Sequence, residues 1–300
     1  MKSASRDDAK AAGVSNGGGL LRSALGAGLY PFLSRWLDPS RRYCQFTYAQ
    51  ILSRLMPPGA AWLDAGCGHQ VFKLNSSREE AEIIARTRLA VGCDLSSQAV
   101  QAHRSLKLKL AADLCALPFA DNSFDVVTLN YVAEHLQHPA VTFSEIARVL
   151  RRDGLAIIVT PNAQGYFVKL TRIGRKFLPE SFVRRFILFR EFRSADDVFP
   201  TFYRANTRND LRCHLEPAGM SEREFQLLKD PAMFNFVAPL AALEMIVMRF
   251  LSFLGFSTLA AGTIIGVYRR TGSRLSPLEC GVNGTVQREA FDGSRAGARC

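Results

Sequence analysis

The sequence predicts an α/β fold built on a seven-stranded, mostly parallel sheet with helices on both faces. Short apolar runs alternate with amphipathic stretches, and this alternation requires crossover connections between parallel strands. A polar residue also closes each of the first five runs. Because the carboxyl ends of parallel strands meet at one edge of a sheet, a ligand site is expected at that edge, near Asp64, Asp94, Asp113, Asn130 and Asn162.

The first five strands are expected in apolar runs at residues 60–66, 88–96, 108–114, 123–132 and 155–162. Helix-like stretches separate them at residues 76–87, 98–106 and 139–154. The serines that follow Asp94 can cap the second of these helices. In the third helix the apolar residues share one face, and Gly154 is expected to end it as a C′ glycine.

The second half of the chain is less regular, with a helix expected in residues 207–220 and strands in residues 221–230 and 261–270. Residues 234–259 form an apolar segment that is long enough to span a bilayer. Glu244 and Arg249 interrupt it, and one crossing would leave the last strand on the wrong side of the membrane. A buried or membrane-surface helix is therefore expected.

Length and composition favour one large domain, since the chain has 300 residues of which 48% are hydrophobic. The domain is expected at residues 21–271, with a helical insertion at about 165–208 and a hydrophobic helical insertion at about 232–259. Residues 1–20 are expected to be disordered and residues 272–300 to form a flexible tail. No secretory signal is visible, and the seven cysteines are widely spaced and expected as thiols. A cytoplasmic protein is predicted, with the inner face of the membrane as an alternative location.

The formal net charge of +11 fits an acidic partner, which could be nucleic acid, anionic lipid or a phosphorylated substrate. Basic tails on an otherwise ordinary protein would also explain it. Residues 169–193 interleave arginines and lysines with phenylalanines. This stretch suits either a roof over an anionic, lipid-linked acceptor, with contact to an anionic membrane surface, or a packed helical cap with a charged exterior.

The loop after the first strand contains two glycines, Gly66 and Gly68, around Cys67. Glycines there let the backbone turn tightly and approach a ligand closely. A dinucleotide loop would carry a third glycine and face a pyrophosphate. Here that glycine is absent, and Asp64 would repel a pyrophosphate but suits an ammonium group. The ligand is therefore expected to have a cationic end.

The next two strand ends predict the rest of this ligand. Asp94 can accept hydrogen bonds from both hydroxyls of a ribose. Asp113 and the apolar Leu114 can meet the amino group and the flat face of an adenine. S-adenosyl-L-methionine combines a ribose, an adenine and a cationic amino-acid end, and it has no pyrophosphate.

The stretches LDAGCG, VGCDLS, AADLCALPFADNSFDVVTLNYVAEHL and ARVLRRDGLAIIVTPN resemble the successive motifs of class I S-adenosylmethionine-dependent methyltransferases. The resemblance is to the type 11-like group that includes quinone-biosynthesis and glycan-tailoring enzymes. It implies a Rossmann-like sheet, with Asn130 on the sulfonium side of the cofactor. His69 and Gln70 depart from the small residue usual in the family. The other cofactor-binding residues implied are Asp64, Gly66, Cys67, Gly68, Asp94, Leu95, Asp113 and Leu114.

The resemblance also suggests where an acceptor would react. His135 follows the fourth strand and is the candidate general base, or else a capping or supporting histidine. Tyr131 could wall the methyl pocket, and Tyr203 and Arg204 could reach the acceptor. Arg42 and Tyr43 are expected on a helix that could cover the cofactor. No metal is required, and two other histidines are expected at the surface, His103 and His138.

The acceptor expected is a small molecule, a saccharide or a lipid- or polyprenyl-linked compound, methylated at oxygen. An RNA methyltransferase is the first alternative, suggested by the charge. Against nucleic acid, the fourth strand ends in NYVAEH, where base-amine enzymes usually carry an Asn/Asp-Pro-Pro-aromatic tetrad, and no RNA-binding module is visible. A catalytically inactive cofactor-binding protein is the second alternative. The sequence does not specify the acceptor or the oligomeric state.

Overall fold

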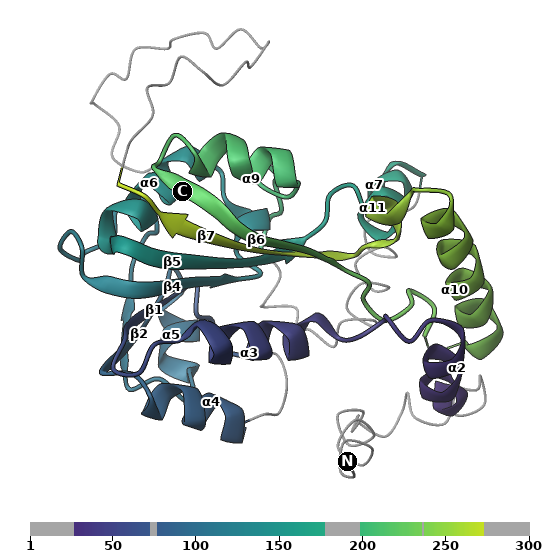
Figure 1. Cartoon of the computed structure of the whole chain (residues 1–300), viewed down its shortest axis with the longest axis horizontal. Helices are drawn as coiled ribbons and strands as arrows, with labels where there is room; N and C mark the ends of the chain where they lie inside the picture. The colour runs from purple at the N-terminus through teal and green to yellow at the C-terminus, as the bar shows by residue number, and fades with distance from the viewer. Residues whose placement is uncertain (1–26, 73–76, 178–198, 236, 273–300) are drawn as a thin grey trace, which may run out of the picture.

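A computed structural model describes residues 27–72, 77–177, 199–235 and 237–272. Within these residues, one sheet has the strand order β3-β2-β1-β4-β5-β7-β6 (Figure 1). Strands β1 to β5 are parallel, and β7 runs antiparallel to both β5 and β6. The predicted fold class is confirmed. The strands are β1 Ala61–Ala65, β2 Leu89–Asp94, β3 Leu108–Ala111, β4 Phe124–Asn130, β5 Leu150–Pro161, β6 Met220–Leu228 and β7 Thr263–Arg270.

Helices cover both faces of this sheet, and side chains alternate between them along each strand. On one face, Trp62 of β1 packs in a core with residues of α3 (Cys44–Leu55) and α4 (Ser77–Ala85). On the other, Leu63 packs in a core with residues of α6 (Pro139–Val149) and α9 (Arg208–Leu215). The sheet is therefore buried on both sides. The short helix α5 (Ser97–Ala102) is capped by Ser96 as expected, and Thr207 caps α9.

The end of α6 differs from the expectation. The helix stops at Val149, and Leu150 already pairs with Phe124 of β4. The extra residues before the next paired position form a bulge in which Asp153 has φ of 64°. Gly154 is therefore not a C′ glycine, and that prediction is wrong. The strand pairing of Leu150 takes the chain out of the helix first.

Three smaller expectations are also wrong. His103 is 5% exposed, because its Nδ1 accepts hydrogen bonds from two backbone amides, and burial lowers its pKa to about 4. Arg42 and Tyr43 lie before α3 and not on a helix, since the Arg42 amide donates to the Lys229 carbonyl. Cys115 is disulfide-bonded, so the expectation of a thiol fails there. It holds for Cys44, Cys67, Cys93 and Cys213.

A second group of helices lies beyond the carboxyl ends of the parallel strands and is called the lobe below (Figure 1). Its core combines Met245 and two alanines with three partly buried residues of one helix, which are Tyr30, Leu33 and Leu37. No helix in the described residues is long and apolar enough to cross a membrane. The domain limits of 21–271 stay a proposal. The lobe consists of α2 (Tyr30–Leu37), α7 (Tyr166–Phe177), α10 (Ala238–Phe253) and α11 (Ser257–Ala260).

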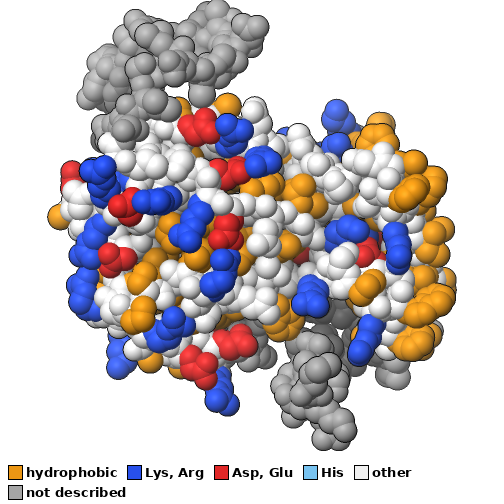
Figure 2. All heavy atoms as spheres, in the orientation of Figure 1, with side chains coloured by type: hydrophobic (Ala, Val, Ile, Leu, Met, Phe, Trp, Pro, Cys, Tyr) orange, Lys and Arg blue, Asp and Glu red, His pale blue; other side chains and the backbone are white. Residues whose placement is uncertain are grey.

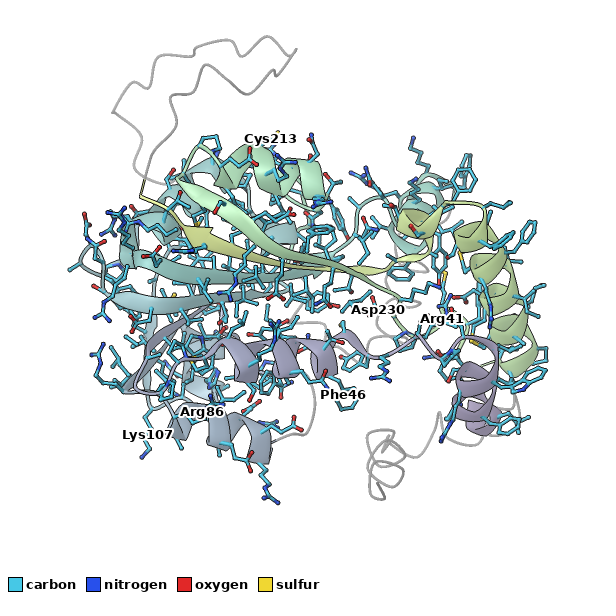
Figure 3. The ribbon with its side chains drawn as sticks, viewed as in Figure 1. Arg41, Phe46, Arg86, Lys107, Cys213 and Asp230 are labelled. Carbon is cyan, nitrogen blue, oxygen red and sulfur yellow. The ribbon has the colours of Figure 1, made fainter. Side chains whose placement is uncertain are left out.

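Glu244 of α10 holds the lobe together from inside. Its carboxylate accepts hydrogen bonds from the Met233 amide at 2.8 Å, the Phe234 amide at 3.1 Å and the Tyr166 hydroxyl of α7. The Arg41 guanidinium lies 3.6 Å from it and also donates to the Asp230 carbonyl at 3.0 Å. Figure 3 shows Arg41 and Asp230 between the sheet and α10. Of the two charges that interrupt the apolar segment, Glu244 is therefore buried and paired, whereas Arg249 is exposed and donates to the Leu37 carbonyl.

We expect Glu244→Ala to lower the free energy of unfolding by roughly 3–5 kcal/mol, because it leaves two amides without their acceptor and removes one of the two carboxylates that offset the buried charge of Arg41. Urea denaturation followed by circular dichroism measures this. The matched control is Glu224→Ala, which removes a solvent-exposed pair with Arg54 and should matter far less. Equal losses in the two variants would contradict the structural role of Glu244.

Candidate functional site

The turn after β1 is built by two glycines with different tasks. Gly66 has φ of 74° and Gly68 has φ of 55°. A Cβ on Gly66 would stand 2.3 Å from a methyl group of Val132, whereas a Cβ on Gly68 would meet nothing within 4 Å. The amides of Gly66 and Cys67 both donate to the Cys93 carbonyl, at 2.7 and 3.0 Å. Gly66 thus permits close packing, and Gly68 leaves open space beside the backbone, as a ligand requires.

Asp94, the last residue of β2, holds this turn in place. Its Oδ2 accepts a hydrogen bond from the Gly68 amide, and its Oδ1 accepts one from the Ser96 amide, both at 2.9 Å. Each carboxylate oxygen has a second lone pair, so ribose hydroxyls can still donate to it. The adjacent Leu95 is 49% exposed. Asp94 therefore shapes the turn, and its contact with a ribose stays a prediction.

Asp64 is almost completely buried, with 2% of its surface exposed. Its Oδ1 accepts a hydrogen bond from the Thr128 hydroxyl at 2.6 Å. Burial is the main cause that raises the pKa of this carboxyl to about 7, and nearby Glu80 and Asp94 raise it further. A cationic group would stabilise the ionised form here, so the residue fits a ligand with an ammonium group. The direct contact itself stays a prediction.

The remaining cofactor candidates lie along the same edge. Asp113 follows β3 and accepts a hydrogen bond from the Cys115 amide at 2.9 Å, while Leu114 is buried in the core. Asn130 ends β4 and exchanges two hydrogen bonds with the Gln45 amide, each 3.0 Å long. Its Nδ2 also donates to the Val71 carbonyl at 3.0 Å. Asn130 thereby ties α3 to the segment after the glycine turn.

Gln45 is a site residue that sequence reasoning missed. It is fully buried at the start of α3, and its two hydrogen bonds with Asn130 satisfy the buried amide there. His69 lies in a turn, and Gln70 lies in irregular backbone directly after it. The two residues that follow them, Val71 and Phe72, form a bend, so His69 and Gln70 do not begin a helix. The Phe72 amide donates to the Glu80 carboxylate at 2.9 Å and fixes the segment that follows them.

The Tyr131 hydroxyl contacts the first residue of α3 and the first residue of β7. The oxygen lies 3.1 Å from the Cys44 sulfur and 3.0 Å from the Thr263 hydroxyl. Thr263 in turn donates to Asp230 at 2.5 Å. The backbone of Tyr131 has φ of 59°, a conformation that costs energy for a residue with a side chain. The tyrosine is thus held firmly beside Asn130.

His135 lies on a short helix, η3 (Ala133–His135), directly after β4. Its Nδ1 donates to the Pro200 carbonyl at 2.7 Å, and its Nε2 lies 3.8 Å from the Glu134 carboxylate. Glu134 is 2% exposed and accepts from the Thr160 hydroxyl at 3.1 Å. The histidine therefore has one nitrogen held by the backbone and the other close to a buried carboxylate.

The segment before α9 is attached to η3 through its backbone. The amides of Phe202 and Tyr203 both donate to the Glu134 carbonyl, at 2.8 and 3.2 Å. Tyr203 has φ of 53°, and the Arg172 guanidinium lies 5.4 Å from its ring centre. Arg204 is exposed and donates to the Gln137 carbonyl at 2.6 Å. The structure thus brings Tyr203 beside η3 and uses Arg204 to secure the segment.

These features define a class of protein. A parallel sheet in this order, with an antiparallel β7, a glycine turn after β1 and a carboxylate at the end of β2, is the fold of class I S-adenosylmethionine-dependent methyltransferases. Residues 63–158 match the methyltransferase domain family. The resemblance stated from the sequence is therefore confirmed over these residues.

Relatives and solved structures share this domain. The chain is 36% identical over 104 residues to demethylmenaquinone methyltransferase of Corynebacterium kroppenstedtii, covering 34% of this chain and 42% of that protein. It is 37% identical over 115 residues to a probable S-adenosylmethionine-dependent methyltransferase of Mycobacterium tuberculosis, covering 37% and 40%. It thus spans about two fifths of these relatives. A putative methyltransferase structure from Bacillus halodurans matches 75% of this chain and 99% of that one, with 17% identity and a TM-score of 0.47.

These matches support S-adenosyl-L-methionine as the cofactor. The residues of this edge fit the cofactor, because the open side of Gly68, the carboxylate of Asp94 and the buried carboxyl of Asp64 lie along it. No group of three or more metal-ligating side chains is found among the residues that the structure describes.

We expect Asp94→Ala to abolish binding of S-adenosylmethionine, because it removes the predicted ribose acceptor and releases the Gly68 amide. Isothermal titration calorimetry measures the loss. Asp94→Asn keeps one acceptor oxygen and should bind weakly. Asp121→Ala, which removes an exposed carboxylate that pairs with Arg148, is the matched control and should bind as the unmodified chain does. Unchanged affinity in Asp94→Ala would contradict the cofactor site.

The raised pKa of Asp64 predicts a pH dependence of stability. Between the ordinary pKa of 3.8 and about 7, the folded chain holds a proton that the unfolded chain releases, so this carboxyl makes stability fall as pH rises through that window. Asp64→Asn removes the effect. The melting temperature of the variant relative to the unmodified chain should therefore increase from pH 4 to pH 7. A constant difference across that range would contradict the assignment.

Proposed function

We propose that the protein transfers the methyl group of S-adenosylmethionine to an oxygen atom of a small-molecule, saccharide or lipid- or polyprenyl-linked acceptor. One observation carries this proposal: the glycine turn fixed by Asp94 lies on the same sheet edge as η3, which presents His135 beside a buried carboxylate. The cofactor would supply a methyl group that is already strongly electrophilic. The chain then needs to orient the acceptor, exclude water and take up a proton.

The surroundings of His135 support its role as the general base. Because a carbonyl oxygen can only accept, the hydrogen bond to Pro200 places a proton on Nδ1 and leaves Nε2 able to accept one. The Glu134 carboxylate near Nε2 would stabilise the imidazolium that forms. Tyr131 would wall the methyl pocket, and Tyr203 would contact the acceptor from the segment attached to η3. Arg204, already bonded to Gln137, would position that segment.

The acceptor class is supported by the quinone methyltransferase among the relatives and by the basic lobe beyond the sheet edge. We place the protein in the cytoplasm, with the inner membrane face as a working surface. The alternatives are less well supported. RNA methylation rests on the net charge of +11 alone. An inactive cofactor-binding protein rested on His69 and Gln70, which lie after the intact Gly66–Gly68 turn.

Transfer of a labelled methyl group tests the function as a whole. The purified chain should label a component of a small-molecule and lipid extract from cells that lack the gene, and Asp94→Ala should not. The same cells should contain a compound that is one methylene lighter than its counterpart in cells with the gene. Labelling of RNA alone would establish the first alternative, and cofactor binding without any transfer would establish the second.

We expect His135→Ala to reduce turnover by roughly 100-fold or more while leaving the affinity for S-adenosylmethionine unchanged, since general bases contribute about that much. His135→Gln can still donate to the Pro200 carbonyl but cannot take up a proton, so it should be equally slow. The control is His138→Ala, which changes an exposed histidine three residues away. Full activity in the glutamine variant would rule out a general base and leave only a positioning role.

A further inference from the structure

The outward side of the lobe is apolar. The helix α10 turns Glu244 and Met245 inward and leaves most of its large aliphatic and aromatic side chains exposed, together with Arg249. Figure 2 shows these side chains gathered along the right edge, over α10. We call them, with exposed residues of α2 and α7, the lobe surface. It consists of Phe32, Trp36, Leu170, Ile173, Phe177, Leu240, Leu243, Ile246, Val247, Phe250, Phe253 and Leu254.

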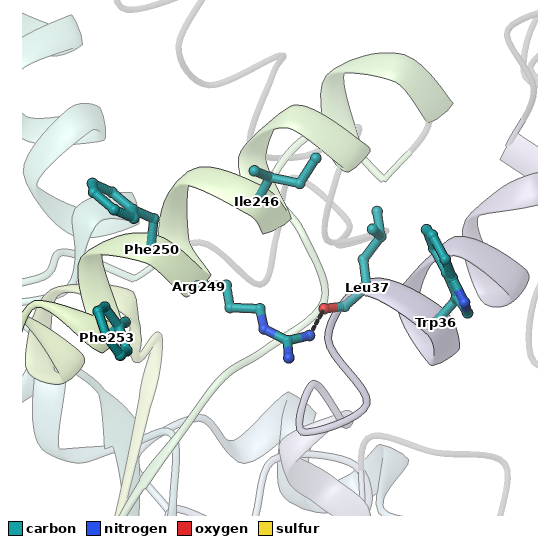
Figure 4. Close-up of a pocket in the computed structure, with 6 residues that line it drawn as sticks. All are labelled: Trp36, Leu37, Ile246, Arg249, Phe250 and Phe253. Atoms are coloured by element: carbon teal, nitrogen blue, oxygen red, sulfur yellow. Dashed lines mark hydrogen bonds between the residues drawn. The ribbon is translucent and has the colours of Figure 1, made fainter.

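A shallow groove crosses this surface between α2 and α10 (Figure 4). Trp36 and Leu37 line one side, and Ile246, Phe250 and Phe253 line the other. Trp36 is 75% exposed and Phe253 is 85% exposed. Contiguous apolar patches of this kind are rare on monomeric soluble proteins, and they mark sites of contact with a partner or a membrane.

The charges around the lobe surface all have one sign. In residues 27–43, 165–177 and 230–262, the described exposed ionised side chains are basic, whereas Asp38 and Glu244 are buried and Asp230 is half-buried. Two of the three acids pair with Arg41 or lie close to it. An apolar surface with a purely cationic rim is complementary to an anionic bilayer. The exposed basic residues are Arg35, Arg42, Lys169, Arg172, Lys176 and Arg249.

The geometry disfavours two alternatives, which are a membrane-spanning helix and a symmetric dimer formed through this surface. The 16 residues of α10 span about 24 Å, less than the roughly 30 Å of a hydrocarbon core, so the helix lies on a bilayer and does not cross it. A second copy of the chain would bring a like-charged rim against this one, which is unfavourable in a symmetric interface. Anionic lipid headgroups instead neutralise the rim.

We propose that the lobe surface docks the protein on an anionic lipid bilayer, with α2 and α10 lying in the interface. The lobe stands beyond the carboxyl ends of the parallel strands, so docking sets the methyl-transfer edge against the membrane (Figure 1). Where the proposed function also holds, the acceptor is a lipid-phase compound that reaches His135 and Tyr203 from the bilayer. Docking itself requires neither cofactor nor acceptor.

Trp36 provides a direct probe. The chain has two tryptophans, and Trp62 is fully buried in the core, so a change in emission on vesicle addition reports Trp36. Vesicles of phosphatidylcholine and phosphatidylglycerol should shift the emission to shorter wavelength, and brominated acyl chains should quench it. Trp36→Phe should abolish both signals while the protein still pellets with the vesicles.

Two sets of variants test the two components of the surface. Phe250→Glu with Phe253→Glu should abolish pelleting with these vesicles, and Val141→Glu, on the exposed side of α6, should not. Lys169→Gln with Lys176→Gln should weaken binding by roughly fivefold for each charge removed, and high salt should reproduce the loss. Lys107→Gln, on the opposite side of the molecule in Figure 3, should leave binding unchanged.

Three results would overturn the proposal: no pelleting with anionic vesicles at low salt, equal losses in the control variants, or a dimer in solution that Phe253→Glu dissociates. Thermal melts of each variant confirm that it is folded. Methyl transfer to a water-soluble acceptor without vesicle binding would leave the proposed function intact and remove the docking. Vesicle binding that persists in an inactive Asp94→Ala variant would support docking independently of catalysis.

Discussion

Parallel pairing of β1 with β2 on one side and β4 on the other is the constraint from which the cofactor site follows. The register sets Asp64 opposite Gly92 and Thr128, so the threonine hydroxyl meets the carboxyl. One residue later on β2, the Cys93 carbonyl receives the amides of the turn, and Asp94 then reaches Gly68. A slip of one residue would point each of these side chains to the opposite face of the sheet and dismantle the turn.

A second constraint acts in the lobe, where α10 buries its one carboxylate and exposes most of its large apolar side chains. Glu244 is tolerated because three hydrogen bonds and Arg41 compensate its burial. On the outer face, exposed apolar side chains contact water, and no polar interaction offsets the cost of that contact. Such a distribution is unfavourable for a helix surrounded by water and favourable for one lying against hydrocarbon. In the proposed function, docking through the lobe surface would therefore bring the methyl-transfer edge of the sheet to the membrane.

Most strands and the glycine turn were predictable, because apolar runs, strand-end carboxylates and glycines act locally. The failures arose where a distant partner decided the outcome. Leu150 pairs with Phe124 in the sheet and does not continue the helix. His103 is buried, where it accepts hydrogen bonds from two backbone amides. The pairing of Gln45 with Asn130 joins residues 85 positions apart, and the bond from His135 to Pro200 joins residues 65 apart. No local pattern in the chain marks either contact.

The sequence by itself determined the class of fold, the edge of the sheet where we predict the cofactor to bind and the residue types that line this edge. These follow from alternation, from strand-end carboxylates and from the conformational freedom of Gly66 and Gly68. Only the tertiary structure decided which nitrogen of His135 is held by a carbonyl, how Tyr203 comes beside η3, and that Glu244 faces inward while the apolar side of α10 faces out. Each of these depends on contacts between segments far apart in the chain, whose geometry exists only after the sheet and the lobe have packed.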